Sequence, residues 1–504
     1  MAASVGSALN WWARTKGEDT ALIVGEDRLT YRELHDWSSR LARRLADDGV
    51  KPGDRVGLLG PNALVWPVVA LAIIKSGAVL VPLNARLKPA EIRKVADDSG
   101  LSLIVASASH VPAAEEARAG GRDFAVTDFG IAESERHGDP DDFKIDRAPE
   151  DPIAVIFTSG STGLSKGVIL TSTTLLNIVL ENTLTQQGFR PATVTLLLLP
   201  LAFTPGLVYG VLVTTVLGGT LIVEPELNAD RAVRLIEQHG VRTLFGVPLI
   251  FEAMSKSAGF ADADLTSLQT AIIGGAAVPV DLLTRWAEKG VLLRQIYGMT
   301  EAGGVATATL AHEALEHPGS CGIGSIFTDV QVMNPDGTLC APGEHGEIVV
   351  RGPLVTPGYW DDPQSTAQAI HDGWLHSGDL GVADEYGRIT FVDRMKDLII
   401  SGGINISPVE LESAIGSLDG VAEVAVIAAA DARFGETPAA ILTGSVQDHT
   451  VVIAHCETLL SDYKIPRYVV LRDEPLPRLP SGKIDKKAIR AEYHDVAERF
   501  PRAR

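Results

Sequence analysis

Residues 158–168 read Thr-Ser-Gly-Ser-Thr-Gly-Leu-Ser-Lys-Gly-Val and form the most informative segment of this sequence. They follow an apolar run, Ile153 to Phe157, which predicts a buried strand. Glycine lets the backbone approach an anion closely and adopt positive φ, the hydroxyls are neutral donors, and Lys166 adds a positive charge. The segment therefore predicts a strand followed by a phosphate-binding loop.

Two known motifs compete for this loop. The P-loop pattern, counted from Gly160, requires a glycine where Ser165 stands and a hydroxyl where Gly167 stands, so it fails twice. The nucleophile-elbow pattern G-x-S-x-G matches from Gly163 to Gly167, but an elbow follows its strand directly. Here seven residues, six of them small or polar, separate Phe157 from Ser165. A serine hydrolase using Ser165 stays an alternative, as does a flexible turn without a ligand.

Composition limits the classes of protein that fit. A chain of 504 residues requires two or more domains, and 45% hydrophobic residues with 49 glycines and 28 prolines indicate a loop-rich α/β protein. A net charge of −20 argues against general nucleic-acid binding. The three cysteines lie far apart without metal-ligand spacing, and Met1 to Gly17 contains no apolar signal segment. We therefore expect reduced thiols and a cytoplasmic location.

The segment from Val194 to Val223 contains no charged side chain and is long enough to span a bilayer. Prolines and glycines interrupt it, including Pro200, Pro205 and Gly210. We therefore expect a strand, a loop, a buried helix and a second strand, and no membrane span.

Helical and strand patterns alternate over residues 1–190 and again over 193–307, which predicts largely parallel sheets covered by helices. Thr30 and Glu33 have the spacing of a capping box at a helix start. Residues 319–393 contain short strands and tight turns, which indicate a small, mostly antiparallel β subdomain. Further strands are expected at Val56–Leu59, Ala78–Pro82, Leu103–Ala106, Thr243–Val247 and Thr270–Ile273.

The last part of the chain, from about residue 396, is long enough for a small domain of helices and strands. Ser407 to Glu410 predicts a helix start with proline at the first helical position and a capping box. Residues 464–490 contain eight basic and three acidic side chains, a local charge of +5 in an acidic protein. This run is either a solvated surface or a site for an anion such as ATP or CoA.

Two glycine-rich segments are expected at the carboxyl ends of strands, where open α/β sheets bind ligands. Gly274-Gly275-Ala276 is poor in side chains, so a planar ring can lie against it. In the second segment, residues 297–301, Tyr297 offers an aromatic face, Thr300 a hydroxyl and Glu301 a hard oxygen ligand suited to magnesium.

Charged side chains in the last third complete the candidate site. Asp379 stands between glycines, where its carboxylate can accept two ribose hydroxyls. Residues 393–397 contain four charged side chains before an apolar run, and Lys483 stands on a flexible turn from which it can enter and leave a site.

These motifs occur in the order, and at roughly the separations, found in acyl-CoA synthetases. From about Trp12 to Arg490 the sequence resembles the adenylate-forming enzymes, which include acyl- and aryl-CoA synthetases, peptide-synthetase adenylation domains and firefly luciferase. The resemblance implies an α/β fold with a large N-terminal domain, residues 1–393, of two doubly wound βα subdomains plus a small β subdomain. A hinge at 394–396 and a small mobile C-terminal α+β lid domain, residues 397–504, would follow.

The resemblance also implies a reaction and its participants. ATP would activate a carboxylic acid as acyl-AMP, with magnesium assisting, and the thiol of coenzyme A would then accept the acyl group. A carrier protein is the alternative acceptor, and a homodimer is left open. Expected partners are thus an acid, ATP and CoA, without nucleic acid.

Each role implied by the resemblance falls on numbered positions of this sequence. Catalysis would depend on Lys483, Glu301, Thr300 and Lys166, and magnesium would bind Glu301 and Thr162. Lys396 would be the hinge residue, and Ser401, Gly402 and Gly403 would line the path of the thiol. The nucleotide would contact Thr158, Ser159, Gly160, Ser161, Thr162, Gly163, Gly274, Gly275, Ala276, Tyr297, Gly298, Met299, Asp379 and Arg394.

The sequence departs from the family beside the acid. Many relatives have Phe-His within a Pro-x-Phe-His-x-x-Gly stretch, whereas this chain has Ala202 and Phe203 there. Phe203 cannot pair with an α-amine, and no cation between 194 and 223 would meet a second carboxylate. We therefore expect a hydrophobic monocarboxylic acid, with room for a bulky one; the alternative is that the two changes only compensate in volume. The expected acid pocket contains Ala202, Phe203, Thr204, Leu207, Gly303 and Gly304.

Overall fold

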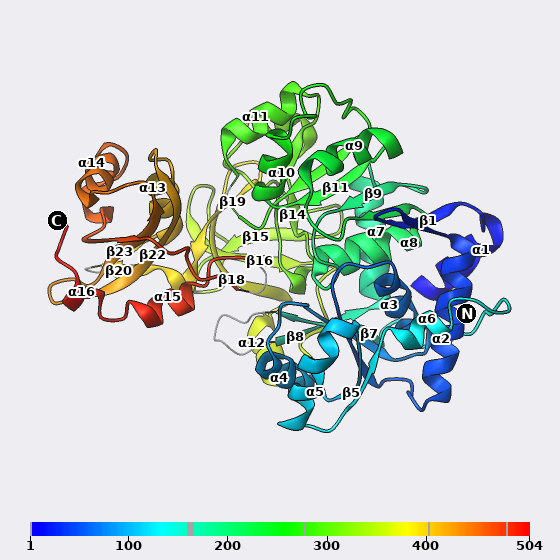
Figure 1. Ribbon diagram of the computed structural model, residues 1–504. Coiled ribbons are helices and arrows are strands. Elements are labelled where there is room, and N and C mark those ends of the chain that lie inside the picture. Colours follow the sequence, from blue (N-terminus) through cyan, green and yellow to red (C-terminus); the bar gives the residue numbers. More distant parts are fainter. Residues whose placement is uncertain (1–2, 159–165, 277, 402–403, 480–481, 504) are drawn as a thin grey trace. The chain divides into compact units, whose positions relative to one another are not determined.

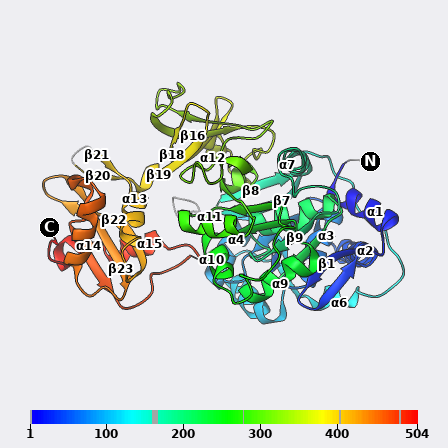
Figure 2. The ribbon, with the colours of Figure 1, turned by 90° about the horizontal axis from the view of Figure 1, so that it is seen from above.

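The computed structural model describes residues 3–158, 166–276, 278–401, 404–479 and 482–503. The chain divides into two compact units (Figures 1 and 2). The N-terminal unit comprises Met1–Val330 and Val349–His376, and the C-terminal unit comprises Gln331–Ile348 and Ser377–Arg504. This division assigns residues 377–393 to the C-terminal unit, whereas the sequence suggested a boundary at 393, which stays a prediction.

The first sheet of the N-terminal unit ends in the strand pair that flanks the expected phosphate loop. Its strand order is β6-β5-β3-β4-β7-β8, and all neighbours are parallel except the antiparallel pair β7–β8. Helices α4 (Pro89–Ser99) and α5 (Val111–Ala119) bury their apolar side chains against one face. The four predicted strands are confirmed as β3 (Arg55–Leu59), β4 (Val79–Leu83), β5 (Leu101–Ala106) and β7 (Pro152–Thr158), and β6 (Ala125–Asp128) and β8 (Lys166–Thr171) complete the sheet.

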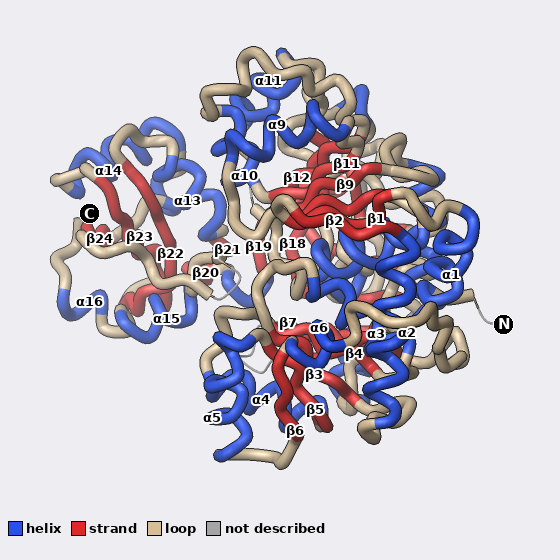
Figure 3. Tube along the Cα trace, turned by 45° about the vertical axis from the view of Figure 1, so that its right-hand side comes forward, coloured by secondary structure: helices blue, strands red, loops and turns tan. Residues whose placement is uncertain are grey.

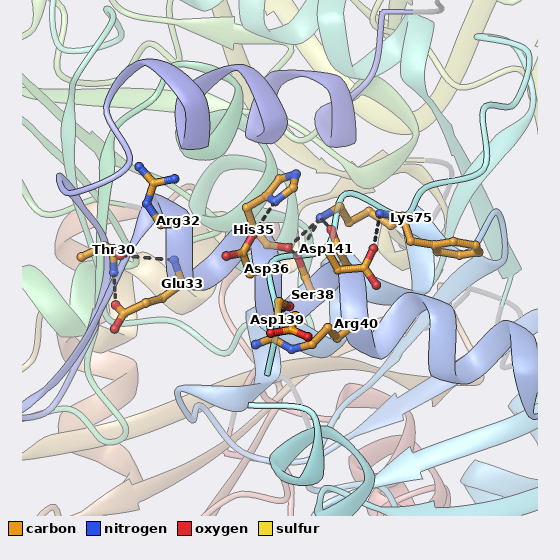
Figure 4. Close-up of polar contacts among 12 residues, drawn as sticks. Thr30, Arg32, Glu33, His35, Asp36, Ser38, Arg40, Lys75, Asp139 and Asp141 are labelled. Atoms are coloured by element: carbon orange, nitrogen blue, oxygen red, sulfur yellow. Dashed lines mark hydrogen bonds and ion pairs between the residues drawn. The ribbon is translucent and has the colours of Figure 1, made fainter. Parts of the chain in front are cut away.

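Helix α2 (Tyr31–Asp47) begins with the predicted capping box. The Thr30 hydroxyl accepts from the Glu33 backbone at 3.2 Å, and the Glu33 carboxylate accepts from the Thr30 backbone at 2.8 Å. Helix α3 (Val65–Lys75) packs against α2 and ends in a buried lysine (Figure 4). The remaining helices here are α1 (Val5–Thr15), η1 (Ala108–His110) and α6 (Gly130–Ser134).

The Lys75 amine donates to three oxygens of α2: the carbonyl of His35 at 3.0 Å, Ser38 Oγ at 3.0 Å and Ser39 Oγ at 2.6 Å. Burial lowers the pKa of Lys75 to about 7, although Asp36, Asp141 and Asp142 raise it; Lys144 lowers it further. The contact therefore joins two core helices through a group that titrates near neutrality.

The second sheet of the N-terminal unit has eight strands, in the order β14-β13-β12-β11-β9-β10-β1-β2 (Figure 3). It is parallel between its antiparallel edge strands β2 and β14. Helices α9 (Ala229–His239), α10 (Pro248–Ser255) and α11 (Val280–Glu288) cover one face. The strands are β1 (Thr20–Val24), β2 (Asp27–Thr30), β9 (Val194–Leu197), β10 (Thr220–Val223), β11 (Thr243–Gly246), β12 (Thr270–Ile273), β13 (Leu293–Tyr297) and β14 (Thr307–Ala308).

The uncharged segment from Val194 to Val223 forms the strand, loop, helix and strand predicted for it. The helix is unusual, because Pro205–Val213 (η2) forms a π-helix and only Thr214–Val216 (α8) is α-helical. π-Helical turns are rare and occur frequently at functional sites. Over the described part of the chain, no helix combines the length and apolar character that crossing a bilayer requires.

A small five-stranded sheet follows, ordered β15-β16-β18-β17 with β19 paired to β18, as the short strands and turns predicted. The pairs β17–β18 and β18–β19 are antiparallel. Its strands are β15 (Asp329–Met333), β16 (His345–Arg351), β17 (Ile370–His371), β18 (Trp374–Ala383) and β19 (Ile389–Arg394), and nearby helices are α7 (Ser172–Thr185), η3 (Thr300–Ala302), η4 (Ala311–Glu313) and α12 (Pro363–Ala369).

The C-terminal unit contains a second five-stranded sheet with helices on both faces. Alternate residues of β22 (Val421–Asp431) and β23 (Gly435–Gly444) face α13 and α14 on one side and α15 and α16 on the other. The other elements are η5 (Met395–Asp397), β20 (Ile399–Ser401), β21 (Ile404–Ile406), α13 (Pro408–Gly416), α14 (His449–Leu459), η6 (Asp462–Lys464), β24 (Tyr468–Arg472), α15 (Lys486–Glu492) and α16 (Val496–Arg499).

The start of α13 corrects one sequence prediction. Ser407 caps the helix by accepting from the Glu410 backbone at 3.2 Å. The Glu410 carboxylate does not complete a capping box; it binds Lys464 at 2.6 and 2.7 Å instead. Lys464, distant in sequence, has therefore replaced the Ser407 backbone as the partner of the Glu410 carboxylate.

Candidate active site

The strands around the expected phosphate loop bring its two described ends together. Thr158 ends β7 and Lys166 begins β8, and the two residues are paired across the antiparallel ladder. The Thr158 hydroxyl donates to the Lys166 carbonyl at 3.4 Å. The predicted contacts at Ser159, Gly160, Ser161, Thr162 and Gly163, and the alternative nucleophile Ser165, lie outside the described residues.

Glu301 and Lys166 meet at a tyrosine that the sequence reasoning missed. Tyr359 Oη donates to Glu301 Oε1 at 2.9 Å, and Lys166 Nζ lies 4.7 Å from the centroid of the same ring. Burial and the Glu301 carboxylate raise the pKa of Tyr359, so this hydroxyl keeps its proton and acts as a donor. The predicted residues Lys166 and Glu301 are thus brought together within the N-terminal unit.

Thr300 connects this group to the expected acid pocket. Its hydroxyl lies 2.8 Å from that of Thr204, just before the π-helix. Thr204 and Gly303 line a cavity of about 10 Å³, room for about one water. The described lining is uncharged: Ile156, Val168, Ile169, Leu170, Thr174, Thr204, Val208, Thr300, Gly303, Leu354 and Thr356.

The other acid-pocket residues differ in exposure. Leu207 is fully buried, Ala202 is buried, and Phe203 is half-buried two residues before the π-helix. A Cβ atom added to Gly304 would lie 2.9 Å from the Tyr209 ring and 3.1 Å from Thr204, so only glycine fits there. Their role in binding the acid stays a prediction.

The expected adenine segment lies at the carboxyl ends of two adjacent parallel strands, as predicted. Gly274 follows β12 and is buried. A Cβ atom added to it would lie 2.5 Å from the Ile296 side chain, which is too close, so a larger residue would not fit. Gly275, with φ of +80°, and Ala276 are exposed. Tyr297 ends β13 and is 7% exposed, so its ring lies mainly in the core; Gly298 and Met299 follow it toward Thr300. Contact with adenine stays a prediction for all of these residues.

In the C-terminal unit, Asp379 and Arg394 form the expected pair. They face each other across β18 and β19, and Arg394 Nε lies 2.7 Å from Asp379 Oδ1. The Asp379 carboxylate is only 2% exposed, whereas Arg394 is 45% exposed. Gly378, with φ of +71°, lies within β18 directly before Asp379, and its backbone donates to Glu347 at 2.8 Å.

Lys483 belongs to the same cluster. Its side chain is exposed, and its pKa is lowered by partial desolvation and by the positive charge of Arg394, while Asp379 raises it. Lys396 is the middle residue of the short helix after β19, and burial lowers the pKa of its amine. Ser401 ends β20 and is half-buried; Gly402 and Gly403 lie outside the described residues.

The basic run at 464–490 is mainly a set of structural ion pairs. Lys486 binds the half-buried Glu412 at 2.7 Å, Arg490 binds Asp397 at 2.8 Å, and Arg478 binds Glu423. Burial raises the pKa of Glu412 despite Lys486. These pairs lie on both sides of Lys483 along the chain. Most basic side chains of this segment therefore bind carboxylates of the same unit, which is neither a simple solvated surface nor a run that binds an anion along its whole length.

Magnesium was expected at Glu301 and Thr162. Within the described ranges no cluster of three or more His, Cys, Asp or Glu side chains is arranged to hold a metal. A single buried carboxylate that shares Tyr359 with Lys166 still fits magnesium, which usually keeps several waters and binds one or two carboxylates plus phosphates. Glu301 suits that role; Thr162 lies outside the described residues.

Comparison with known proteins gives matches over most of the chain. Residues 9–360 match the family model of the AMP-binding enzymes, and residues 410–483 match the model of their C-terminal domain. The chain is 39% identical over 491 residues to a feruloyl-CoA synthase of an Amycolatopsis species, covering 95% of this chain and 97% of that protein. It is 34% identical to a long-chain-fatty-acid–CoA ligase of Mycobacterium tuberculosis, covering 92% and 93%.

The fold also matches solved structures over nearly its full length. The o-succinylbenzoate-CoA synthetase of Bacillus subtilis, solved with its acyl-adenylate intermediate, is 28% identical with a TM-score of 0.87, covering 96% of this chain and 97% of that one. The extent of these matches leaves no large part of either unit without a counterpart. This chain is therefore a member of the AMP-binding enzyme family and an acid–thiol ligase of the adenylate-forming acyl-CoA synthetase type.

Proposed function

We propose that this enzyme activates a hydrophobic monocarboxylic acid as its acyl-adenylate and then transfers the acyl group to CoA. The observation that carries the choice of acid is the uncharged lining of the cavity beside Thr300, as far as the described residues extend. A second carboxylate or an α-ammonium group buried there would lack an opposite charge, which is strongly unfavourable. The named substrates of the two relatives, a feruloyl and a long-chain fatty acyl group, are hydrophobic as well.

Two residues beside the acid also favour a bulky substrate. Ala202 stands where many relatives have an aromatic residue, and the half-buried Phe203 supplies an apolar wall in place of a histidine. We therefore rank aryl and branched acids above short ones. Acetate, malonate and amino acids are expected to be poor substrates.

In the first half-reaction, a carboxylate oxygen attacks the α-phosphorus of ATP, and the bond to pyrophosphate breaks. Lys483 and Lys166 offset the charge that gathers on the phosphates, and Asp379 accepts the ribose hydroxyls while Arg394 holds that carboxylate in place. Magnesium, held by Glu301 and Thr162, would shield the negative charge of the phosphates.

In the second half-reaction, the CoA thiol attacks the acyl carbonyl carbon, the C–S bond forms, and AMP leaves. We propose that the chain pivots at Lys396 between the two steps. Lys483 would then leave the phosphates, and the segment from Ser401 to Gly403 would line the path of the thiol. A homodimer and a cytoplasmic location stay predictions.

The test is a panel of acids in an ATP-dependent pyrophosphate-release assay, followed by product analysis. Ferulate, long-chain fatty acids and polycyclic propanoates should release pyrophosphate faster than acetate, malonate or amino acids. The acyl group should then appear on CoA. Preference for the small or charged acids would refute the proposed substrate class. Exclusive transfer of the acyl group to a carrier protein would refute CoA as the acceptor. Ester hydrolysis without ATP would favour the Ser165 alternative.

A further inference from the structure

The segment Thr356–Trp360 is bound to the strand that carries Lys166. The Ile169 backbone donates to the Gly358 carbonyl at 3.2 Å, and the Trp360 backbone donates to the Gly167 carbonyl at 2.7 Å. Tyr359 forms a β-bridge with Val168. These bonds hold Tyr359 beside β8, two residues along from Lys166.

The same segment is also bound to Glu301. The Thr356 backbone donates to the Glu301 carbonyl at 2.8 Å, and Tyr359 Oη donates to Glu301 Oε1 at 2.9 Å. Both side chains are buried, Tyr359 at 8% and Glu301 at 7% exposure. A hydrogen bond to a buried carboxylate is stronger than one between neutral groups. Tyr359 therefore restricts how the Glu301 carboxylate can turn.

The ring of Tyr359 has a second use. Lys166 Nζ lies 4.7 Å from the ring centroid, within cation–π range. The hydroxyl thus contacts the anionic group and the ring contacts the cationic one. The bond to Oε1 does not use the other carboxylate oxygen of Glu301, which can still take a ligand.

We propose that Tyr359 is a positioning residue for the nucleotide: its hydroxyl orients Glu301 toward the magnesium–phosphate group, and its ring holds Lys166 at the phosphate loop. This inference rests on the proposed function for the identity of the ligand. It assigns two separable roles to one side chain, so that two substitutions should have different effects.

The experiment measures equilibrium binding of a non-hydrolysable ATP analogue to the full chain, with magnesium varied and with EDTA. Tyr359→Phe keeps the ring and removes the hydroxyl, so the magnesium concentration for half-maximal binding should rise about 10- to 100-fold, as for other partners of metal ligands. Binding in EDTA should not change. Tyr359→Leu also removes the ring, so binding in EDTA should weaken about 2- to 30-fold.

Tyr31→Phe is the matched control, because Tyr31 Oη donates to the Gly219 carbonyl at 2.6 Å and the side chain is likewise buried, at 1% exposure, in the same unit. It should bind nucleotide like the wild type. An unchanged magnesium dependence in Tyr359→Phe, or an equal change in Tyr31→Phe, would overturn the inference. Acyl-CoA formation by the wild type is measured separately. If the wild type forms no acyl-CoA but Tyr359→Phe still shifts the magnesium dependence of binding, the proposed function is overturned and the role of Tyr359 is not.

Discussion

The stability of the N-terminal unit should rise with pH above neutrality, and replacing Lys75 with methionine should remove that rise. Methionine keeps the length of the side chain and removes the amine. In the folded chain the pKa of Lys75 is about 7, against 10.5 for an ordinary lysine. Between these values the unfolded chain binds more protons than the folded one, so stability increases with pH; below about 7 both states are protonated and this contribution is flat.

The size of the effect follows from the same values. Each pKa unit corresponds to about 1.4 kcal/mol, so the full difference is of the order of 5 kcal/mol. From pH 7.5 to 9.0 the wild type should gain about 2 kcal/mol relative to Lys75→Met. The absolute difference at one pH also includes the three oxygens that lose their donor, His35 O, Ser38 Oγ and Ser39 Oγ, so the change with pH is the informative quantity.

Tryptophan fluorescence suits this measurement, because all seven tryptophans lie in the N-terminal unit. Trp37 and Trp66 are buried on α2 and α3, the two helices that Lys75 joins. Denaturant unfolding at several pH values, followed by emission, therefore reports on the relevant unit. Lys94→Met, on an exposed ion pair with Asp98, is the control and should run parallel to the wild type. Parallel curves for the wild type and Lys75→Met between pH 7.5 and 9.0 would refute the reasoning.

Three further predictions concern the active site. Lys483→Ala should slow acyl-adenylate formation about 10²-fold or more, while largely sparing thioester formation from supplied acyl-adenylate; equal loss in both half-reactions would contradict its role. Asp379→Asn should weaken ATP binding but affect binding of 2′,3′-dideoxy-ATP much less, and calorimetry showing equal losses would exclude a ribose contact. Ala202→Phe should raise the KM for bulky acids about 10-fold or more but leave that for small acids unchanged, since only bulky acids use the space; equal changes across the panel would refute this.

Local signals in the sequence predicted much of the fold. The strands β3, β4, β5, β7 and β12 were predictable because each is a short apolar run, and buried parallel strands need no polar alternation. The cap of α2 was predictable because Thr30 and Glu33 bind each other within one turn. The candidate residues at strand ends were predictable because parallel strands present their carboxyl ends at one edge.

What could not be predicted depends on contacts between distant segments. The role of Tyr359 arises only when residues 356–360 pair with β8, and no spacing in the sequence announces that pairing. The partner of Glu410 was misassigned because its carboxylate pairs with Lys464, 54 residues away, and not with the backbone of Ser407. The π-helical form of 205–213 was missed because a helix that is apolar all round has no polar face to reveal its period.

That π-helix has a consequence for how this enzyme lineage can change its substrate. Its hydrogen bonds span one residue more than those of an α-helix, so the loss of a single amino acid can return the segment to ordinary winding without breaking it. Single-residue deletions through 205–213, each tested for its preference among acids, would reveal whether insertions and deletions change the acid specificity more readily than point substitutions do.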